Sequence, residues 1–228
     1  TLDLGTFTAN RGTSTTGGSF TVASGAFLKI GGTNTFPANY ATVTLNLTST
    51  VEYSGTNQAV SAKSFGNLIL SSSAGAATKT MPATAFVIGK DFTSNIGTGT
   101  SVSYTAASNI TVSGNVNIGT ATTFNGASFT HNIAGSWTNS GTFTGTTSTI
   151  NMTGDGSVIS GTGVHNFFNI IIAGSNITAA ATSSITIGGN LTTISPGVFT
   201  HLPGGTLTMS GAAKSISGTG ITFDNVTV

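Results

Sequence analysis

The sequence predicts an all-β protein, a right-handed parallel β-helix (β-solenoid) of roughly ten coils with about 20–25 residues in each coil. Three observations predict this fold class. Apolar residues alternate with polar ones along the chain, which is the period of a strand rather than of a helix. Short motifs recur from the first third of the chain to its last residue. Gly, Ser, Thr and Asn fill the segments between the expected strands, as they do in turns.

The alternation marks the expected strands in chain order. Val, Ile, Thr and Phe favour strands, whereas Gly, Asn and Ser interrupt helices and favour turns. The alternating apolar residues are Val43, Leu45 and Leu47; Ile110 and Val112; Ile150 and Met152; Leu207 and Met209; and Val226 and Val228. Ala-rich segments such as AGAAT at 74–78 are short and adjoin Ser or Gly. Helix is therefore nearly excluded.

One motif occurs three times, as SFGNLIL at 64–70, NFFNIII at 166–172 and TFDNVTV at 222–228. We expect its Phe to fill the interior at one corner and its two apolar residues to stack along one wall. We expect its Asn to lie at the bend, where Asn tolerates the left-handed conformation and bonds neighbouring backbone. These repeat positions are Phe65, Asn67, Leu68 and Leu70; Phe167, Asn169, Ile170 and Ile172; and Phe223, Asn225, Val226 and Val228.

A longer motif precedes each of these copies. It reads STVEYSGTNQAVS at 49–61, STINMTGDGSVIS at 148–160 and GTLTMSGAAKSIS at 205–217. Tyr53 aligns with Met152 and Met209 in this motif, so we expect it to belong to the core.

These repeats predict the domain organisation. The chain is expected to be one β-solenoid segment over residues 1–228, with degenerate internal repeats at 49–93, 148–192 and 205–228. The last expected strand runs to Val228 without a polar cap. We therefore expect the segment to belong to a longer array, or its ends to stack head to tail, because an open solenoid end offers unpaired backbone.

A second motif has an apolar residue, a short polar turn and a second apolar residue. It occurs as IGKDFT at 88–93, VSGNVN at 112–117, IAGSWT at 133–138 and IGGNLT at 187–192. Its equivalent places are held by Phe92, Val116, Trp137 and Leu191. The steps from Phe92 to Val116 and from Val116 to Trp137 predict one coil each. The much longer step from Trp137 to Leu191 predicts two or more coils.

A row of β-sandwich modules is the alternative architecture, since sandwiches also show turn signals every 8–12 residues or so. Two features favour the solenoid instead. Only 5% of the residues are charged, against roughly 25% in an ordinary soluble domain. The repeat is also shorter than a sandwich needs to close a core.

Composition bounds the partners and the compartment. The formal net charge is +1 and the six cations are scattered singly, so no nucleic-acid footprint is expected. There is no Cys, hence no disulfide framework and no thiolate metal site. No stretch approaches the roughly 18 apolar residues of a membrane helix, so no membrane insertion is expected. Any signal peptide is expected to have been removed or to lie outside this sequence.

Residues 49–93 carry a recognisable series of elements. These are Ser49, Thr50, Val51, Tyr53 and Gly55; Gln58 and Val60; Phe65, Asn67, Leu68 and Leu70; Lys79, Thr80, Met81 and Pro82; and Ile88, Asp91, Phe92 and Thr93. The series resembles the repeat region of very long secreted surface proteins of the Bacteroidota type, which are adhesin-like and exported by type IX secretion. Later copies lose the Gln and the Lys-Thr-x-Pro element. The resemblance implies a scaffold repeat without catalytic residues, outside the cell or on the surface of a bacterium.

No catalytic, metal or cofactor site is expected. Glycosidase chemistry needs two carboxylates about 5–10 Å apart, and Asp3, Glu52, Asp91, Asp155 and Asp224 are spread along the chain without a local pair. Asp91 and Asp155 are interpreted as turn residues. The histidines at 131, 165 and 201 lack metal-ligand spacing, and we expect isolated surface or corner side chains.

Two functions from different classes follow. The first is a structural one, a stalk or fibre segment of a cell-surface adhesin or filament, with head-to-tail stacking or continuation of the same chain, and surface glycans as further partners. The alternative is a binding module that uses a flat solenoid face for carbohydrate or ice; a polysaccharide-active enzyme is a third reading. Ice binding would be supported by Thr at one position in every coil, but the pairs Thr6–Thr8, Thr42–Thr44, Thr142–Thr144 and Thr206–Thr208 are irregularly spaced.

Overall fold

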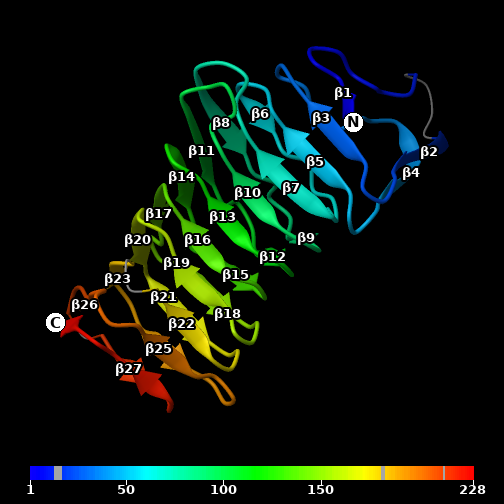
Figure 1. Ribbon diagram of the computed structural model, residues 1–228. Coiled ribbons are helices and arrows are strands. Elements are labelled where there is room, and N and C mark those ends of the chain that lie inside the picture. Colours follow the sequence, from blue (N-terminus) through cyan, green and yellow to red (C-terminus); the bar gives the residue numbers. More distant parts are fainter. Residues whose placement is uncertain (13–16, 181–182, 213) are drawn as a thin grey trace.

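The computed structural model describes residues 1–12, 17–180, 183–212 and 214–228. These residues form strands and no helix. The strands pair in parallel and stack coil upon coil into an elongated β-solenoid of about ten coils, with the two chain termini at opposite ends (Figure 1). The predicted all-β parallel solenoid is confirmed.

Three long sheets form the walls of the solenoid within the described residues. Wall 1 has eleven strands: β1 (Leu2–Asp3), β3 (Phe27–Ile30), β5 (Thr50–Tyr53), β7 (Asn67–Leu70), β10 (Phe92–Ser94), β13 (Val116–Ile118), β16 (Trp137–Asn139), β19 (Val158–Ser160), β22 (Ile177–Ala179), β25 (Phe199–His201) and β28 (Ile221–Thr222). Wall 2 has nine: β6 (Gln58–Ala59), β8 (Ala76–Thr80), β11 (Ser101–Thr105), β14 (Thr122–Asn125), β17 (Thr142–Thr144), β20 (Val164–Phe167), β23 (Ile185–Ile187), β26 (Leu207–Met209) and β29 (Val226–Thr227). Wall 3 has seven: β9 (Phe86–Ile88), β12 (Ile110–Val112), β15 (Thr130–Ile133), β18 (Thr149–Met152), β21 (Asn169–Ile172), β24 (Leu191–Thr193) and β27 (Ile216–Ser217).

The first coils depart from this plan. There β2 (Gly17–Val22) and β4 (Tyr40–Leu45) form a separate two-stranded parallel sheet beside the N-terminal end of the stack (Figure 1). Phe20 of β2 packs against Phe36 and Tyr40, with ring centroids 5.6 and 5.1 Å apart. A small aromatic cluster therefore holds this sheet together.

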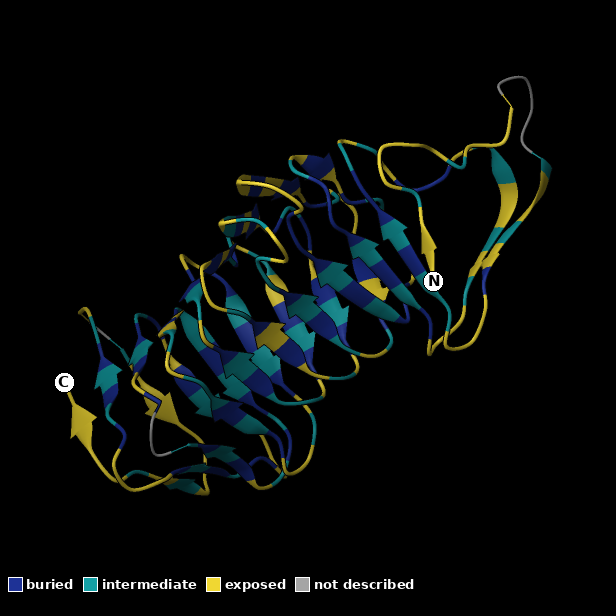
Figure 2. Cartoon of the chain, turned by 45° about the horizontal axis from the view of Figure 1, so that its top comes forward, coloured by how far each residue is buried: buried dark blue, intermediate teal, exposed yellow. Residues whose placement is uncertain are grey.

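From β9 onward, the chain visits wall 1, wall 2 and wall 3 in turn. Burial alternates from residue to residue along most strands, as the colours of Figure 2 show. The interior is a mostly apolar column with a large aromatic share in its middle coils and some buried polar side chains. Tyr53 and Trp137 are fully buried in it, which confirms Tyr53 as a core residue.

The copies of the Phe-x-Asn motif do not stack along one wall, so that expectation is wrong. Leu68 and Leu70 lie in β7 on wall 1, whereas Ile170 and Ile172 lie in β21 on wall 3. Val226 lies in β29 on wall 2. Each copy instead spans a corner between two walls, and each occupies a different corner.

Coil length explains this rotation. Register pairs Phe92 with Val116 and Val116 with Trp137, so each of these two steps is one coil, and the first coil is slightly longer than the second. The interval from Phe65 to Phe167 and the interval from Phe167 to Phe223 are not whole numbers of such coils. Because every corner must turn an apolar side chain inward and then start a strand, one motif fits all three corners.

The Phe positions are interior, as expected. Phe65 and Phe167 are buried, and Phe223 is half-buried against the core. In contrast, Val226 and Val228 are exposed. Within the described residues β29 is the outermost strand of wall 2, with β26 as its one neighbour, so no further coil covers these two side chains.

The copies of the second motif also lie on more than one wall. Phe92, Val116 and Trp137 are in register on wall 1, so the two predicted one-coil steps are confirmed. Leu191 lies on wall 3, where it pairs with Ile170 and Ile216. The interval from Trp137 to Leu191 therefore ends on a different wall rather than after whole coils.

The motif Asn residues bond to neighbouring coils at the bends, as expected. Asn67 donates to the Ser49 carbonyl at 3.1 Å, and the Asn169 side chain accepts from the Asn190 amide at 3.0 Å. Asn225 donates to the Gly205 carbonyl at 3.4 Å. However, none of the three motif Asn residues has a positive φ. The expected left-handed conformation is wrong, and hydrogen bonding between coils accounts for Asn at these corners.

In two of its three copies, the glycine of the longer motif has a steric reason. A Cβ on Gly55 would collide with the carbonyl oxygen of Gly32, and one on Gly154 would collide with that of Ala134. The backbones of successive coils approach so closely here that no side chain fits between them.

Candidate functional site

A buried polar cluster lies inside wall 2 near the N-terminal end. The Lys79 side chain is 1% exposed and that of Gln58 is 3% exposed. Both face inward, and Gln58 pairs with Lys79 in the sheet. These two residues place a charge and an amide where the next coils carry aromatic rings.

Every donor of the Lys79 ammonium has an acceptor. Nζ donates to Gln58 Oε1 and to the Gly55 carbonyl at 2.7 Å each, and to the Thr56 carbonyl at 3.1 Å. Burial lowers the pKa of Lys79 to about 8, and the negative charge of Glu52 opposes that shift. A buried charge is tolerated only when it is hydrogen-bonded in this way.

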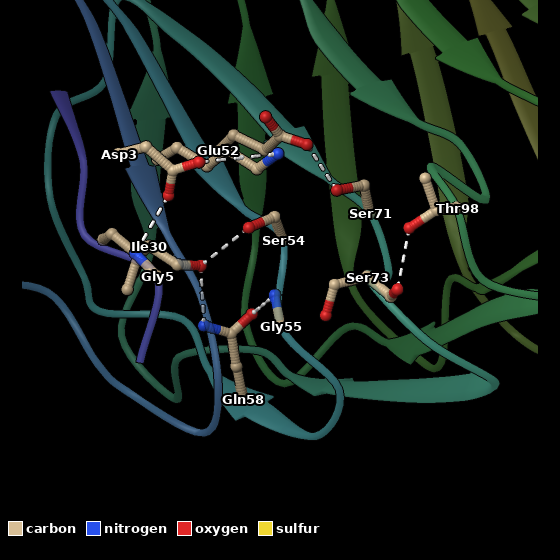
Figure 3. A network of polar contacts seen from close by, with 11 residues as sticks. Asp3, Gly5, Ile30, Glu52, Ser54, Gly55, Gln58, Ser71, Ser73 and Thr98 are labelled. Carbon is tan, nitrogen blue, oxygen red and sulfur yellow. Dashed lines mark hydrogen bonds and ion pairs between the residues drawn. The ribbon is translucent and has the colours of Figure 1, made fainter. Parts of the chain in front are cut away.

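Gln58 ties three segments to this cluster. Its Oε1 also accepts from the Gly55 amide at 2.7 Å. Its Nε2 donates to the Ile30 carbonyl at 3.0 Å and to the Asn34 carbonyl at 2.9 Å. Figure 3 shows Gln58 between Gly55 and Ile30, with Ser54 bonded to the same Ile30 carbonyl at 3.2 Å. All four hydrogen-bonding positions of the side chain are therefore filled.

A row of charges runs across the outside of wall 1 beside this cluster. Asp3 pairs in register with Lys29, and Lys29 with Glu52. Lys29 Nζ lies 4.0 Å from Asp3 Oδ2, and Ser71 donates to Glu52 Oε1 (Figure 3). The signs alternate from coil to coil, so neighbouring side chains attract each other.

The three histidines are buried, which corrects the expectation of surface positions; each nevertheless lies near a turn. His131, His165 and His201 are 1 to 2% exposed and lie in wall 3, wall 2 and wall 1 respectively. Each Nε2 faces a carbonyl oxygen, that of Gly126 at 3.0 Å, of Gly161 at 3.3 Å and of Ser183 at 3.5 Å. Burial lowers the pKa of His131 and His165. These two side chains are therefore neutral inside the solenoid at neutral pH.

The carboxylates are used at corners and along the charge row. Asp91 Oδ1 accepts from the Asn115 amide at 2.7 Å, and Asp155 Oδ1 accepts from the Ser175 amide at 2.8 Å. That bond to Ser175 lowers the pKa of the exposed Asp155. Both residues hold turns in neighbouring coils together, as expected for them. Within the described residues, no group of three or more His, Cys, Asp and Glu side chains is arranged to hold a metal ion.

The middle coils have an aromatic interior. Tyr104 and Phe124 stack with centroids 4.9 Å apart, and Trp137 packs edge-on against Phe143 at 4.8 Å. Phe167 extends the cluster, 5.4 Å from Phe143. Tyr104 also donates to Ser94 Oγ at 3.0 Å. The repeat position Trp137 is thus the centre of a packed cluster rather than an exposed sugar platform.

A shallow hollow of about 440 Å³ lies on the outside of wall 2. Thr78, Thr80, Ser103, Thr105 and Thr123 border it. Met81, Ala106 and Ala107 also line it, so hydroxyl groups of β8, β11 and β14 alternate there with methyl and other apolar groups.

Sequence reasoning missed the buried Lys79–Gln58 pair. Gln58 and Lys79 were visible only as elements of the resemblance. Their separation along the chain equals one coil, since the two residues pair in register, and this was the available signal. Side-chain direction was the missing information, because a lysine on a strand is expected to point outward.

Comparison with protein-family models, with curated proteins and with solved structures gives no match. The fold and the polar contacts define a general class, a parallel β-solenoid repeat protein whose polar side chains mostly join one coil to the next. Nothing in the described residues is a helix of the length and hydrophobicity that crossing a membrane requires.

Proposed function

We propose that the protein is an extracellular structural repeat protein, a stalk or fibre segment of a bacterial cell-surface adhesin or filament that performs no catalysis. One observation carries this proposal. The side chains best suited to catalysis or ligand binding are Lys79, Gln58 and the three histidines. All of them are buried and face backbone groups inside the solenoid. Such groups stabilise a rod and are not presented to a substrate.

Contacts between coils support a mechanical role. At one corner the ladder runs from Asn67 to Asp91, Asn115 and Ser136, each side-chain oxygen accepting an amide of the next coil at 2.7 to 3.3 Å. A similar ladder joins Asn169, Asn190 and Ser215 at 3.0 Å per step. Each coil is therefore tied to its neighbour by side chains as well as by the sheets, which resists bending and pulling apart.

The polysaccharide-active enzyme is the weaker alternative on geometric grounds. Asp91 and Asp155 serve corner bonds to Asn115 and Ser175, and Glu52 lies in the charge row with Lys29. A retaining or inverting glycosidase needs two carboxylates about 5–10 Å apart flanking one bond. Asp3 and Glu52 lie two coils apart, about 10 Å by the coil spacing, but Lys29 stands in register between them. A structural role accounts for these carboxylates directly, through their bonds at the corners and their places in the charge row.

The proposed location and partners rest on features of the sequence. The resemblance of residues 49–93 to secreted adhesin-like repeats and the charge content of 5% support a place outside a bacterial cell. Partners under this proposal are further coils, either of the same chain or of a second copy stacked on the end, and surface glycans.

Immunogold electron microscopy of cells that produce the protein tests this proposal. Antibodies against residues 1–228 are expected to label material outside the cell envelope, and brief protease treatment of intact cells is expected to remove the label. Label confined to the cytoplasm, and unaffected by protease, would overturn the proposed function.

A further inference from the structure

The outer surface of wall 2 carries a regular column of small polar side chains. Register places Thr80, Thr105, Asn125 and Thr144 side by side in successive coils. The column continues through Asn166 and Thr186. Every member bears a hydroxyl or an amide, and Thr occupies most positions. Thr does not hold this position in every coil, because Asn125 and Asn166 interrupt the column, but a hydroxyl or an amide stands at each of these positions.

A second column runs parallel to the first, two residues earlier in each strand. Thr78, Ser103, Thr123 and Thr142 are in register there. Thr78 and Ser103 also share a hydrogen bond at 3.4 Å between their hydroxyls. The column ends at Val164, which pairs with Thr142. Four coils thus present two outward side chains each, and together they make a small grid.

The grid has fixed spacings. Adjacent coils lie about 4.8 Å apart, and alternate residues of a strand lie about 6.6–6.8 Å apart. Both distances are close to repeat distances between oxygen atoms on faces of ice crystals. Thr78, Thr80, Ser103, Thr105 and Thr123 are all exposed, so their hydroxyls and methyls meet solvent.

Walls 1 and 3 offer less of such a surface. On wall 1 the outward column contains the charges of Lys29 and Glu52 and then Ile69, and from β10 onward each three-residue strand adds one outward side chain. Wall 3 carries a shorter two-column stretch, in which Thr130 pairs with Thr149 and Asn132 with Asn151. These wall 3 side chains are mostly half-buried. Among the described strands, wall 2 therefore has the longer and more exposed two-column grid.

We propose that wall 2 binds the surface of ice through this grid, with Thr105 near its centre. The chemistry of the grid selects this occupant. None of the outward positions of β8, β11, β14 and β17 carries a charge or an aromatic ring, so there is no complement for a charged partner and no platform on which a sugar ring stacks. Rows of hydroxyls and methyls at fixed spacing instead order water molecules into positions that merge with the lattice.

The test compares three lysine substitutions within one coil. Thr105→Lys introduces a long charged side chain at the centre of the grid, and Thr93→Lys and Thr111→Lys introduce it at the outward positions of β10 on wall 1 and β12 on wall 3. Thermal hysteresis, and retention of the fluorescently tagged chain in slowly growing ice, are measured for the wild type and for each variant. Circular dichroism and thermal unfolding verify that each variant folds.

The wild type is expected to show thermal hysteresis and to enter ice. Thr105→Lys is expected to lose both properties, while the two control variants keep them. Absence of both properties in the folded wild type at the highest soluble concentration would overturn the proposal. An equal loss in all three variants would also overturn it, because ice binding would then not reside on wall 2. Retention on insoluble neutral polysaccharide, lost in Thr105→Lys without any effect on ice, would replace ice by a glycan surface.

Discussion

Two neighbouring regions of wall 2 fill the same inward column in opposite ways. In the N-terminal coils the column consists of Gln58 and Lys79. In the following coils it consists of Tyr104, Phe124 and Phe143. The backbone pairing continues unchanged from one region to the other, so the difference lies in the side chains alone.

The comparison shows that the solenoid backbone does not require an apolar interior at each position. It also accepts polar side chains, with complete hydrogen bonding at Gln58 and Lys79, although His165 further along the column leaves Nδ1 without a partner. Lys79 has three oxygen acceptors, and Phe124 has rings on both sides. The polar solution depends on every hydrogen bond being kept, whereas the aromatic solution depends on filled volume. The two regions should therefore respond differently to substitution and to pH.

Truncation of the aromatic cluster is expected to have the largest effect. Trp137 is fully buried between Phe143 and Phe167, so Trp137→Ala leaves a large cavity. We expect a loss of about 3–5 kcal/mol in the free energy of unfolding, measured by urea denaturation. Thr138→Ala, at the adjacent outward position, is the matched control. A loss as small in Trp137→Ala as in the control would show that the rings contribute little packing.

Breaking the polar cluster is expected to rank second. Lys79→Met keeps much of the side-chain volume but leaves the Gly55 and Thr56 carbonyls and the Gln58 amide oxygen without this donor. Unpaired buried polar groups cost about 1–3 kcal/mol, so the free energy of unfolding should fall by about that amount. Hydrogen exchange should rise in β6 and β8 and remain unchanged in β14 and β17.

Lys90→Met is the control for this second substitution. Lys90 is exposed, and loss of its charge should leave both stability and exchange unchanged. If Lys79→Met were as stable as the wild type, the polar cluster would have no net stabilising role, as is known for some buried charges that apolar residues replace without loss.

The free energy of unfolding should depend on acid pH through His165, beside the aromatic region, and on alkaline pH through Lys79 in the polar region. Burial lowers the pKa of His165, so the unfolded chain binds more protons than the folded chain below the ordinary histidine value of about 6.5. Stability should therefore fall as pH drops through that value, by up to about 1.4 kcal/mol for each unit of pKa shift. His165→Ile, which copies its neighbour Ile185 in the column, should reduce this dependence between pH 7 and 5, and the part due to His131 should remain.

Lys79 gives the alkaline arm of the same measurement. Its pKa is lowered to about 8, so between that value and the ordinary lysine value of about 10.4 the unfolded chain binds more protons. The wild type should gain stability relative to Lys79→Met across this interval. A parallel pH profile for the two proteins would contradict a lowered pKa at Lys79, just as an unchanged acid limb in His165→Ile would contradict a neutral buried His165.

The charge row on wall 1 is expected to give the smallest effect. Lys29 and Asp3 have side chains 36% and 53% exposed and lie 4.0 Å apart. An exposed pair of this kind contributes about 0–1 kcal/mol, and Lys29→Ala should lower stability by no more than that. The loss should shrink further in 0.5–1 M salt or so, because salt screens exposed charges. A salt-independent loss would point to packing of the Lys29 stem instead.

The class of fold follows from local features of the chain. Period-two alternation at Ile110 and Val112 predicts a strand wherever it occurs, because successive side chains of a strand point to opposite faces. The corner motifs around Phe65 and Phe167 predict where strands begin, because the Phe turns inward and the Asn bonds to a neighbouring coil at the bend. Burial of Tyr53 and the corner bonds of Asp91 were predictable in the same way, from equivalent positions in other copies.

Only the tertiary structure decided on which wall each strand and motif lies. Successive coils differ in length by a few loop residues, and such differences accumulate until equivalent motifs meet different walls. Hence Leu68, Ile170 and Val226 are separated although their sequences match. Likewise the Thr80–Thr105–Asn125 column and the Gln58–Lys79 pair arise only when coils stack in register. Local periodicity determines that a strand forms and which side chains alternate, whereas the register between distant segments is set by packing of the whole column.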